Sequence, residues 1–212
     1  QAPVEVARSV AVPVGTFVAL ALTLVPLVVG RSDQFDPRRF AVYGIDRRHL
    51  AVGLGVAGLV GVPVLAVAVV AVGQVGAWSR SGGTAVLAVV AALLGTLTCA
   101  LLLRVGSAVG ATFVGPHRSR DAGWLAALVI VVLGLPVASL LFRSDWLDPA
   151  STELQRIADV AGWTPWGAAW AVPADVASGR VGEGLLKLLV ALVTVALLAW
   201  AWWALVGAAL EA

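Results

Sequence analysis

The stretch Arg31–Leu50, RSDQFDPRRFAVYGIDRRHL, is a charged island between two long apolar runs, and it decides how the chain is divided. It contains five of the fourteen Lys and Arg residues, together with three Asp. Asp36 can accept a backbone N–H as a helix N-cap, and Pro37 suits the first helical position because it has no N–H to leave unpaired. Gly44 can end this short helix, and Asp46 can cap the next one. The island therefore predicts a structured elbow rather than a slack loop.

The residues on either side of the island are overwhelmingly apolar. The chain is 60% hydrophobic and 12% charged, with a mean hydropathy of +0.98, whereas soluble domains are about a quarter charged. A membrane-spanning helix needs about 20 apolar residues, and transmembrane β-strands would alternate in polarity over about ten. Five non-alternating runs are long enough to span as helices: 10–30, 50–72, 84–103, 124–142 and 185–206. The sequence predicts an all-α, polytopic transmembrane helical bundle over residues 1–212.

Lys and Arg in the connecting segments predict the orientation, because cytoplasmic loops of membrane proteins are enriched in them. The island is basic, and so is the turn after the third run, which contains His117, Arg118, Arg120 and Asp121. Both lie on one side if the runs alternate in direction, so we predict that this side is cytoplasmic. The net charge of +2 then reflects topology, and we expect no nucleic acid as a partner.

The second apolar run begins with small residues at helical spacing. Gly53, Ala57 and Gly61 are four apart, and such a stripe lets another membrane helix approach closely. The same segment, GLGVAG, also matches a dinucleotide-binding pattern, but that pattern requires a preceding strand. We therefore interpret the stripe as a helix-packing surface.

The segment 148–180, between the last two runs, is the least loop-like of the connections. Ser151–Ala161 has apolar residues at helical spacing, and Pro165 can begin a second short helix, TPWGAAWAV, which Pro173 and Gly179 close. Helices this apolar would not stand free in water. We expect them to lie at the outer interface or to dip back into protein at membrane depth.

The sequence lacks the residue patterns of a catalytic centre. Its two histidines, His49 and His117, lie in separate links, and Cys99 is the lone cysteine, so neither a paired-His zinc site nor a Cys-rich metal site is expected. No phosphate-binding GxxxxGK[ST] motif is present. The centres of the predicted spans carry no charge, which argues against proton coupling by this chain alone. Lys187 lies near the end of the last run, where its side chain can snorkel to the interface.

Three passages resemble the membrane (permease) subunits of type-2 ABC exporters, in particular the Ala-, Val- and Leu-rich versions from high-GC bacteria. The first is FDPRRFAVYGIDRRHLAVGLGVAGLVGVPVL, and the second is the turn HRSRDAG after a long third run. The third is GWTPWGAAWAV, followed by ASGRVGEGLLKLL before the last run. Together these passages touch most of the chain.

A permease unit of this family has six spans, starts inside the cell and carries its ATPase-coupling helix between its second and third spans. The resemblance therefore implies one further span before Gln1 and a coupling role for the elbow, 31–49. The coupling residues would be Asp36, Pro37, Arg38, Arg39, Phe40, Tyr43, Asp46, Arg47 and Arg48. The helices within 148–180 would be the short outer helices of the family. Their tryptophans would then form an outer gate: Trp163, Trp166 and Trp170.

The resemblance also implies the partners and the location of the chain. It would work in the inner (plasma) membrane with an ABC-type ATPase subunit that holds Mg-ATP, and with a second copy or second half of the permease. The chain itself would be no enzyme and would hold no cofactor or metal. Two other classes stay open: a non-transport membrane scaffold or assembly subunit, and an intramembrane enzyme whose catalytic residues lie outside these 212 residues.

Overall fold

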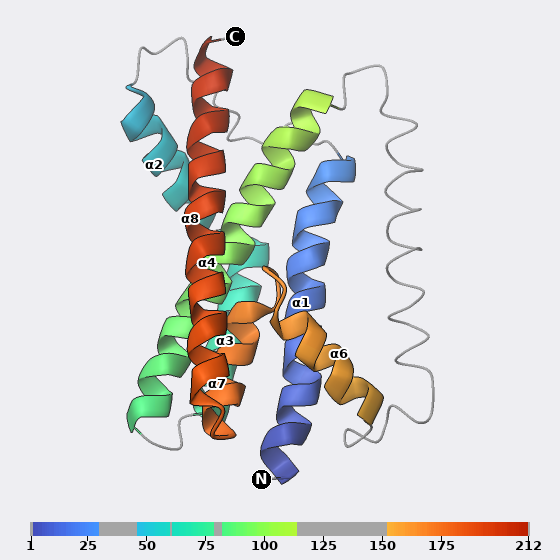
Figure 1. The fold of residues 1–212 in the computed structure, drawn as a ribbon. Helices are drawn as coiled ribbons and strands as arrows, with labels where there is room; N and C mark the ends of the chain where they lie inside the picture. Colours follow the sequence, from blue (N-terminus) through green and yellow to red (C-terminus); the bar gives the residue numbers. More distant parts are fainter. Residues whose placement is uncertain (1, 30–45, 60, 79–81, 114–151, 212) are drawn as a thin grey trace.

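The computed structural model describes residues 2–29, 46–59, 61–78, 82–113 and 152–211, and within these ranges it contains helices and turns but no strand. The helices, in chain order, are α1 (Ala2–Val29), α2 (Arg47–Leu59), α3 (Val62–Trp78), α4 (Gly82–Phe113), α6 (Thr152–Gly162), α7 (Ala168–Ala177) and α8 (Val181–Glu211). The predicted all-α class is confirmed for this part of the chain. The two ends of the chain lie at opposite ends of the bundle (Figure 1).

Three helices are long and apolar enough to cross a membrane, over Val4–Pro26, Gly82–Gly110 and Val181–Ala208. Helices α2 and α3 pass the same test as one bent span, so the described residues contain three or four candidate spans. The chain is therefore a helical membrane protein. The predicted run 124–142 lies outside the described residues, so the expected total of five stays a prediction.

The second predicted span, 50–72, is not one straight helix. Helices α2 and α3 are bent by 65° relative to each other, with the break between Leu59 and Val62. Pro63 explains the break. In a continuous helix the Leu59 carbonyl would accept a hydrogen bond from the N–H of residue 63, but proline has no N–H and its ring clashes with that carbonyl. Pro63 instead lies in the first turn of α3, where proline is tolerated.

The break also changes which face of α2 packs. It removes Gly61 from the helix that holds Gly53, and a Cβ built on Gly53 meets no other atom within 4 Å. Ala57 is partly buried. The face of α2 that is buried in the described bundle is a different one, and it packs against α8 through Leu50, Ala51, Leu54, Trp202 and Val206. Because Gly53, Ala57 and Gly61 do not share one helix, they form no continuous packing stripe here.

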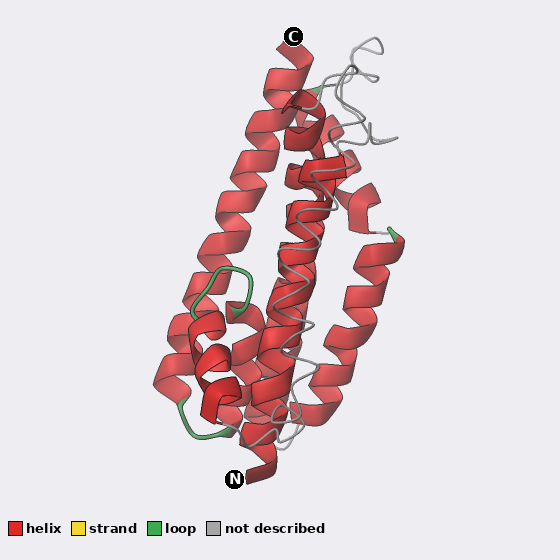
Figure 2. Ribbon diagram, turned by 90° about the vertical axis from the view of Figure 1, so that its right-hand side faces the viewer, coloured by secondary structure: helices red, strands yellow, loops and turns green. Residues whose placement is uncertain are grey.

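Helices α6 and α7 form a hairpin whose second arm, α7, is buried inside the bundle, whereas α6 packs on α1 with one face buried and the other exposed. The hairpin begins at the end of the bundle that holds the N-terminus, turns near mid-height and returns to the same end (Figures 1 and 2). Helix α6 packs on α1, whereas α7 packs on α8, α4 and α1. All residues in 168–175 are buried. Of the two expected placements, the structure therefore has the dip into protein, and Pro173 lies within α7 instead of closing it.

Trp170 fills a slot across the middle of the bundle. Its side chain is 3% exposed and belongs to a core cluster with Ala19, Val67, Ala71, Cys99 and Leu102. Gly15 of α1 makes room for the ring, because a Cβ there would overlap the indole. Gly95 of α4 also faces the ring, at 3.6 Å from a Cβ position to the nearest indole atom. The hairpin reaches this depth because these two helices carry glycine where the aromatic ring inserts.

We predict that Gly15→Ala destabilises the protein by about 1–3 kcal/mol, the usual cost of an overpacked core, because its methyl group would overlap the Trp170 indole. Gly73→Ala is the matched control, since a Cβ at Gly73 meets nothing within 4 Å. Thermal unfolding of the detergent-solubilised protein should give a lower Tm for Gly15→Ala alone. Equal Tm values for the two variants would show that Trp170 does not occupy this slot.

Candidate functional site

Five ionisable side chains from four helices and a turn meet near the open end of the hairpin. We call them the charge cluster: Arg8 of α1, Asp159 of α6, Asp175 of α7, Arg180 of the turn after α7, and Lys187 of α8. Asp175 and Lys187 have no exposed surface, and the Arg8 side chain is 4% exposed. Charged groups this deeply buried are stable only when they are paired. The distances between them therefore show which partner neutralises each charge.

The carboxylate of Asp175 is the centre of the charge cluster. Its Oδ2 accepts a hydrogen bond from Lys187 Nζ at 2.6 Å, and its Oδ1 accepts one from Arg8 Nε at 2.8 Å. Arg180 Nη2 lies 3.0 Å from the same Oδ1. One carboxylate therefore ties α7 to α1, to α8 and to the turn that joins α7 to α8.

Arg8 holds both arms of the hairpin. While its Nε donates to Asp175 on α7, its Nη2 donates to Asp159 Oδ1 on α6 at 2.6 Å. The planar guanidinium suits this role because its donors point in fixed, diverging directions. Arg8 thus fixes the spacing between α6 and α7 as well as their position on α1.

Lys187 points into the protein, so the prediction that it snorkels to the interface is wrong. Besides Asp175, its Nζ lies 3.8 Å from Glu183 Oε2 and 5.1 Å from the centre of the Trp163 ring. A cation over an aromatic face gains further stabilisation where water is excluded. With a carboxylate 2.6 Å away inside the bundle, the side chain gains more by pairing than by extending to the surface.

The charges balance if Glu183 is included. Three cations, Arg8, Arg180 and Lys187, then face three carboxylates. The cluster is graded in depth, because Asp159 is 52% and Glu183 48% exposed, whereas Asp175 is fully buried. The outer carboxylates are therefore partly exposed, whereas the centre is enclosed by protein.

The end of α7 places Arg180 over Asp175. Gly179 has a φ of +84°, its N–H donates to the Val176 carbonyl at 3.1 Å, and the Arg180 N–H donates to the Asp175 carbonyl at 2.9 Å. These two bonds are the Schellman ending of a helix, which requires a left-handed residue that glycine adopts easily. Gly179 therefore closes α7 as the sequence predicts, and the reversal returns the Arg180 side chain to the helix that it follows.

The tryptophans predicted to form an outer gate have different surroundings. Trp170 fills the slot between α1 and α4, and Trp166 packs, partly buried, against the same core cluster. Trp163 is 47% exposed and lies over Lys187. Among the described residues, the buried Nε1 of Trp166 has no hydrogen-bond partner. The structure therefore brings Trp166 and Trp170 together in one core, and associates Trp163 with the charge cluster.

Most of the predicted coupling residues lie outside the described residues: Asp36, Pro37, Arg38, Arg39, Phe40 and Tyr43. The same holds for the second basic turn, His117, Arg118, Arg120 and Asp121. Asp46 is described, and its Oδ2 accepts the Arg48 N–H at 3.3 Å, so it caps α2 as predicted. The start of α2 lies at the end of the bundle opposite the open end of the α6–α7 hairpin (Figure 1).

The sequence does not predict the charge cluster, because the first apolar run, 10–30, excludes Arg8, whereas the candidate span begins at Val4. The signal that could have found it is a single charge in an otherwise apolar helix. Asp175 in AAWAVPADVA and Lys187 in the last run are both of this kind. Each needs a buried partner of opposite sign.

The described residues contain no group of three or more His, Cys, Asp or Glu side chains placed to hold a metal ion. Comparisons with protein-family models, with curated proteins and with solved structures give no match. Inference about function therefore rests on the residues and geometry of this chain.

We predict that Asp175→Asn destabilises the protein by about 3–5 kcal/mol, the usual cost of removing one partner from a buried ion pair. Arg8 and Lys187 would stay buried without their shared carboxylate. Asp159→Asn is the matched control and should cost about 0–1 kcal/mol, because this carboxylate is half exposed. Chemical or thermal unfolding in detergent measures both.

A double variant separates lost pairing from general damage. Asp175→Asn combined with Lys187→Met removes one buried cation together with the carboxylate, so it should be less destabilised than Asp175→Asn alone. A double variant that is no more stable than the single one would show that the Lys187–Asp175 bond is not what holds α7 to α8.

We predict that Trp202→Phe lowers the Tm more than Trp166→Phe does. The two substitutions remove the same atoms, but Trp202 Nε1 donates to the Ala51 carbonyl at 3.1 Å, whereas the buried Trp166 Nε1 has no partner in the part of the chain that the structure describes. A hydrogen bond contributes about 0.5–1.5 kcal/mol, and an unpaired buried donor is itself a cost. A larger loss for Trp166→Phe would mean that its N–H is paired.

Proposed function

We propose that this chain is the transmembrane (permease) subunit of an ATP-driven type-2 ABC exporter, which forms the substrate path and couples to a separate ATPase through the elbow, 31–49. The observation that carries the proposal is the re-entrant α6–α7 hairpin. It lies immediately before the last long helix and opens at the end of the bundle opposite the start of α2. The family resemblance expects short outer helices at this place in the chain.

The hairpin has the properties of a plug in a path through the membrane. Its turn lies near mid-height, and Trp170 closes the space between Gly15 of α1 and Gly95 of α4 at this level. Its arms are fixed by the charge cluster at the open end. A substrate that crosses the bundle here requires the hairpin to move together with the helices that hold it, or those helices to separate around it.

Helix α1 provides a direct connection between the elbow and the hairpin. It has 28 residues and is therefore about 42 Å long, with Val29 next to the elbow and Arg8 within its second turn. A displacement of the elbow would move α1 along or about its axis, and Arg8 would transmit that movement to both arms of the hairpin. In this mechanism ATP-driven closure of the partner ATPase acts on the outer gate through one helix.

The remaining components follow from the same proposal. Mg-ATP is bound by the ATPase subunit, a second copy or second half of the permease completes the path, and the complex lies in the inner (plasma) membrane. The described core around Trp170 is apolar, which suits a hydrophobic or amphipathic substrate.

We predict that the full-length chain co-purifies with an ABC-type ATPase encoded in a neighbouring reading frame, and that Arg38→Glu combined with Arg39→Glu abolishes substrate-stimulated ATP hydrolysis. The reversed charges would weaken docking of the elbow in the groove of the ATPase that it is expected to occupy. Arg156→Glu, on the exposed face of α6, is the control and should retain hydrolysis. The measurement is phosphate release by the reconstituted complex.

Retention of full substrate-stimulated hydrolysis by the Arg38, Arg39 double variant would contradict the coupling role. Co-purification with a different cytoplasmic protein and no ATPase would favour a membrane scaffold. Catalytic turnover by the purified chain without an ATPase would favour an intramembrane enzyme.

A further inference from the structure

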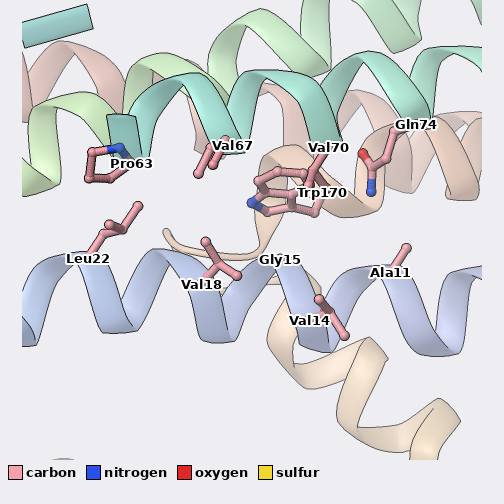
Figure 3. Close-up of a pocket in the computed structure, with 11 residues that line it drawn as sticks. Ala11, Val14, Gly15, Val18, Leu22, Pro63, Val67, Val70, Gln74 and Trp170 are labelled. Atoms are coloured by element: carbon pink, nitrogen blue, oxygen red, sulfur yellow. The ribbon is translucent and has the colours of Figure 1, made fainter. Parts of the chain in front are cut away.

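A groove of about 420 Å³ runs between α1 and α3 (Figure 3). Both helices pack on α4, so the space between them is left open to the side. The indole of Trp170 lies between the two walls. The walls contribute Ala11, Val14, Gly15, Val18 and Leu22 from α1, and Pro63, Ala66, Val67, Val70 and Gln74 from α3.

The long axis of the groove follows the two helices. On α1 the lining extends from Ala11 to Leu22 and on α3 from Pro63 to Gln74, which is about 16 Å in each case at 1.5 Å per residue. Leu22 lies opposite Pro63 at one end, and Ala11 lies opposite Gln74 at the other (Figure 3). The groove is thus an elongated slot along the direction of the spans, about half as long as the hydrocarbon core is thick.

The lining accepts hydrocarbon and rejects most other ligands. It contains no charged side chain, and Gln74 is its one side-chain amide. A sugar, nucleotide or peptide would lose the hydrogen bonds of its polar groups on entering and would find few replacements. Burial of methylene groups has no such cost.

The surface around the groove identifies where the hydrocarbon comes from. Val14 and Val70 line the groove and are 52% and 56% exposed. The same helices expose further large apolar side chains beside it: Val10, Phe17, Leu65 and Val69. On a membrane-spanning helix such a surface faces lipid acyl chains. The groove is continuous with this surface, so an acyl chain can enter sideways without crossing protein.

We propose that this groove binds one acyl chain of a membrane phospholipid. The chain lies along α1 and α3 and passes over the Trp170 indole, with its polar end toward Gln74. Gln74 is one turn from the end of α3 at Trp78, so this end of the groove is the one nearer the membrane surface. Because Trp170 belongs to α7, a bound chain would also brace the α6–α7 hairpin in its slot.

Photolabelling tests the proposal without ATP or a partner subunit, so its outcome is independent of the proposed export function. The full chain is reconstituted in bilayers that contain phosphatidylethanolamine with a diazirine on one acyl chain, irradiated and mapped by mass spectrometry. We expect labels on lining residues that the general surface does not expose, Val18, Leu22 and Val67. Label on the exposed side chains beside the groove alone, such as Phe17, Leu65 and Val69, would overturn the proposal.

A matched pair of variants separates the groove from the general lipid-facing surface. Val70→Trp fills the groove, whereas Val69→Trp adds the same bulk at a neighbouring, 73% exposed position that does not line it. Groove labelling should fall about tenfold in Val70→Trp, the effect of excluding about two methylene groups from an apolar site. It should be unchanged in Val69→Trp. Equal labelling of the groove in both variants, or groove residues cross-linked to a second copy of the chain in place of lipid, would overturn the proposal.

Discussion

The described structure depends on the carboxylate of Asp175. It accepts from Arg8 and Lys187 at 2.8 and 2.6 Å and pairs with Arg180, while having no exposed surface itself. In a membrane protein, charged and polar groups at depth have no water to return to and must find partners within the protein. Because Arg8 and Lys187 both pair with Asp175, this one carboxylate joins α1, α7 and α8.

The two ends of the hairpin are held by different forces. At the charge cluster the contacts are directional, so they determine position and spacing to within a hydrogen-bond length. At the turn the contacts are apolar, with Trp170 between Gly15 and Gly95, and apolar contact is non-directional. The charge cluster therefore fixes the position of the hairpin by directional bonds, whereas Trp170 fixes its depth by fitting the space that Gly15 and Gly95 leave.

Helix α1 connects the features on which both proposals depend. Arg8 holds the hairpin, Gly15 admits Trp170, and Ala11 to Leu22 form one wall of the groove. Its far end leads into the elbow that is expected to contact an ATPase. A movement of α1 would change the charge cluster, the slot and the groove together. An acyl chain in the groove would contact both α1 and Trp170, which relates lipid occupancy to the position of the hairpin.

The sequence alone determined the features that depend on local composition. Long apolar runs predicted the all-α membrane class, Asp46 predicted the cap of α2, and Gly179 predicted the end of α7, because each signal acts within a few residues. Pro63 is a sequence signal for the break between α2 and α3. The mean hydropathy over about 20 residues does not register one proline, so the run 50–72 was predicted as a single span. Only the tertiary structure decided that Lys187 points inward, that Arg8 joins α6 to α7, and that Trp170 inserts between α1 and α4. The physical reason is that a buried charge or a large ring is stabilised by partners on other helices. Arg8 and Asp175 are 167 residues apart in the chain, and even Lys187 and Asp175, 12 residues apart, belong to different helices. No local pattern records which partner folding brings near.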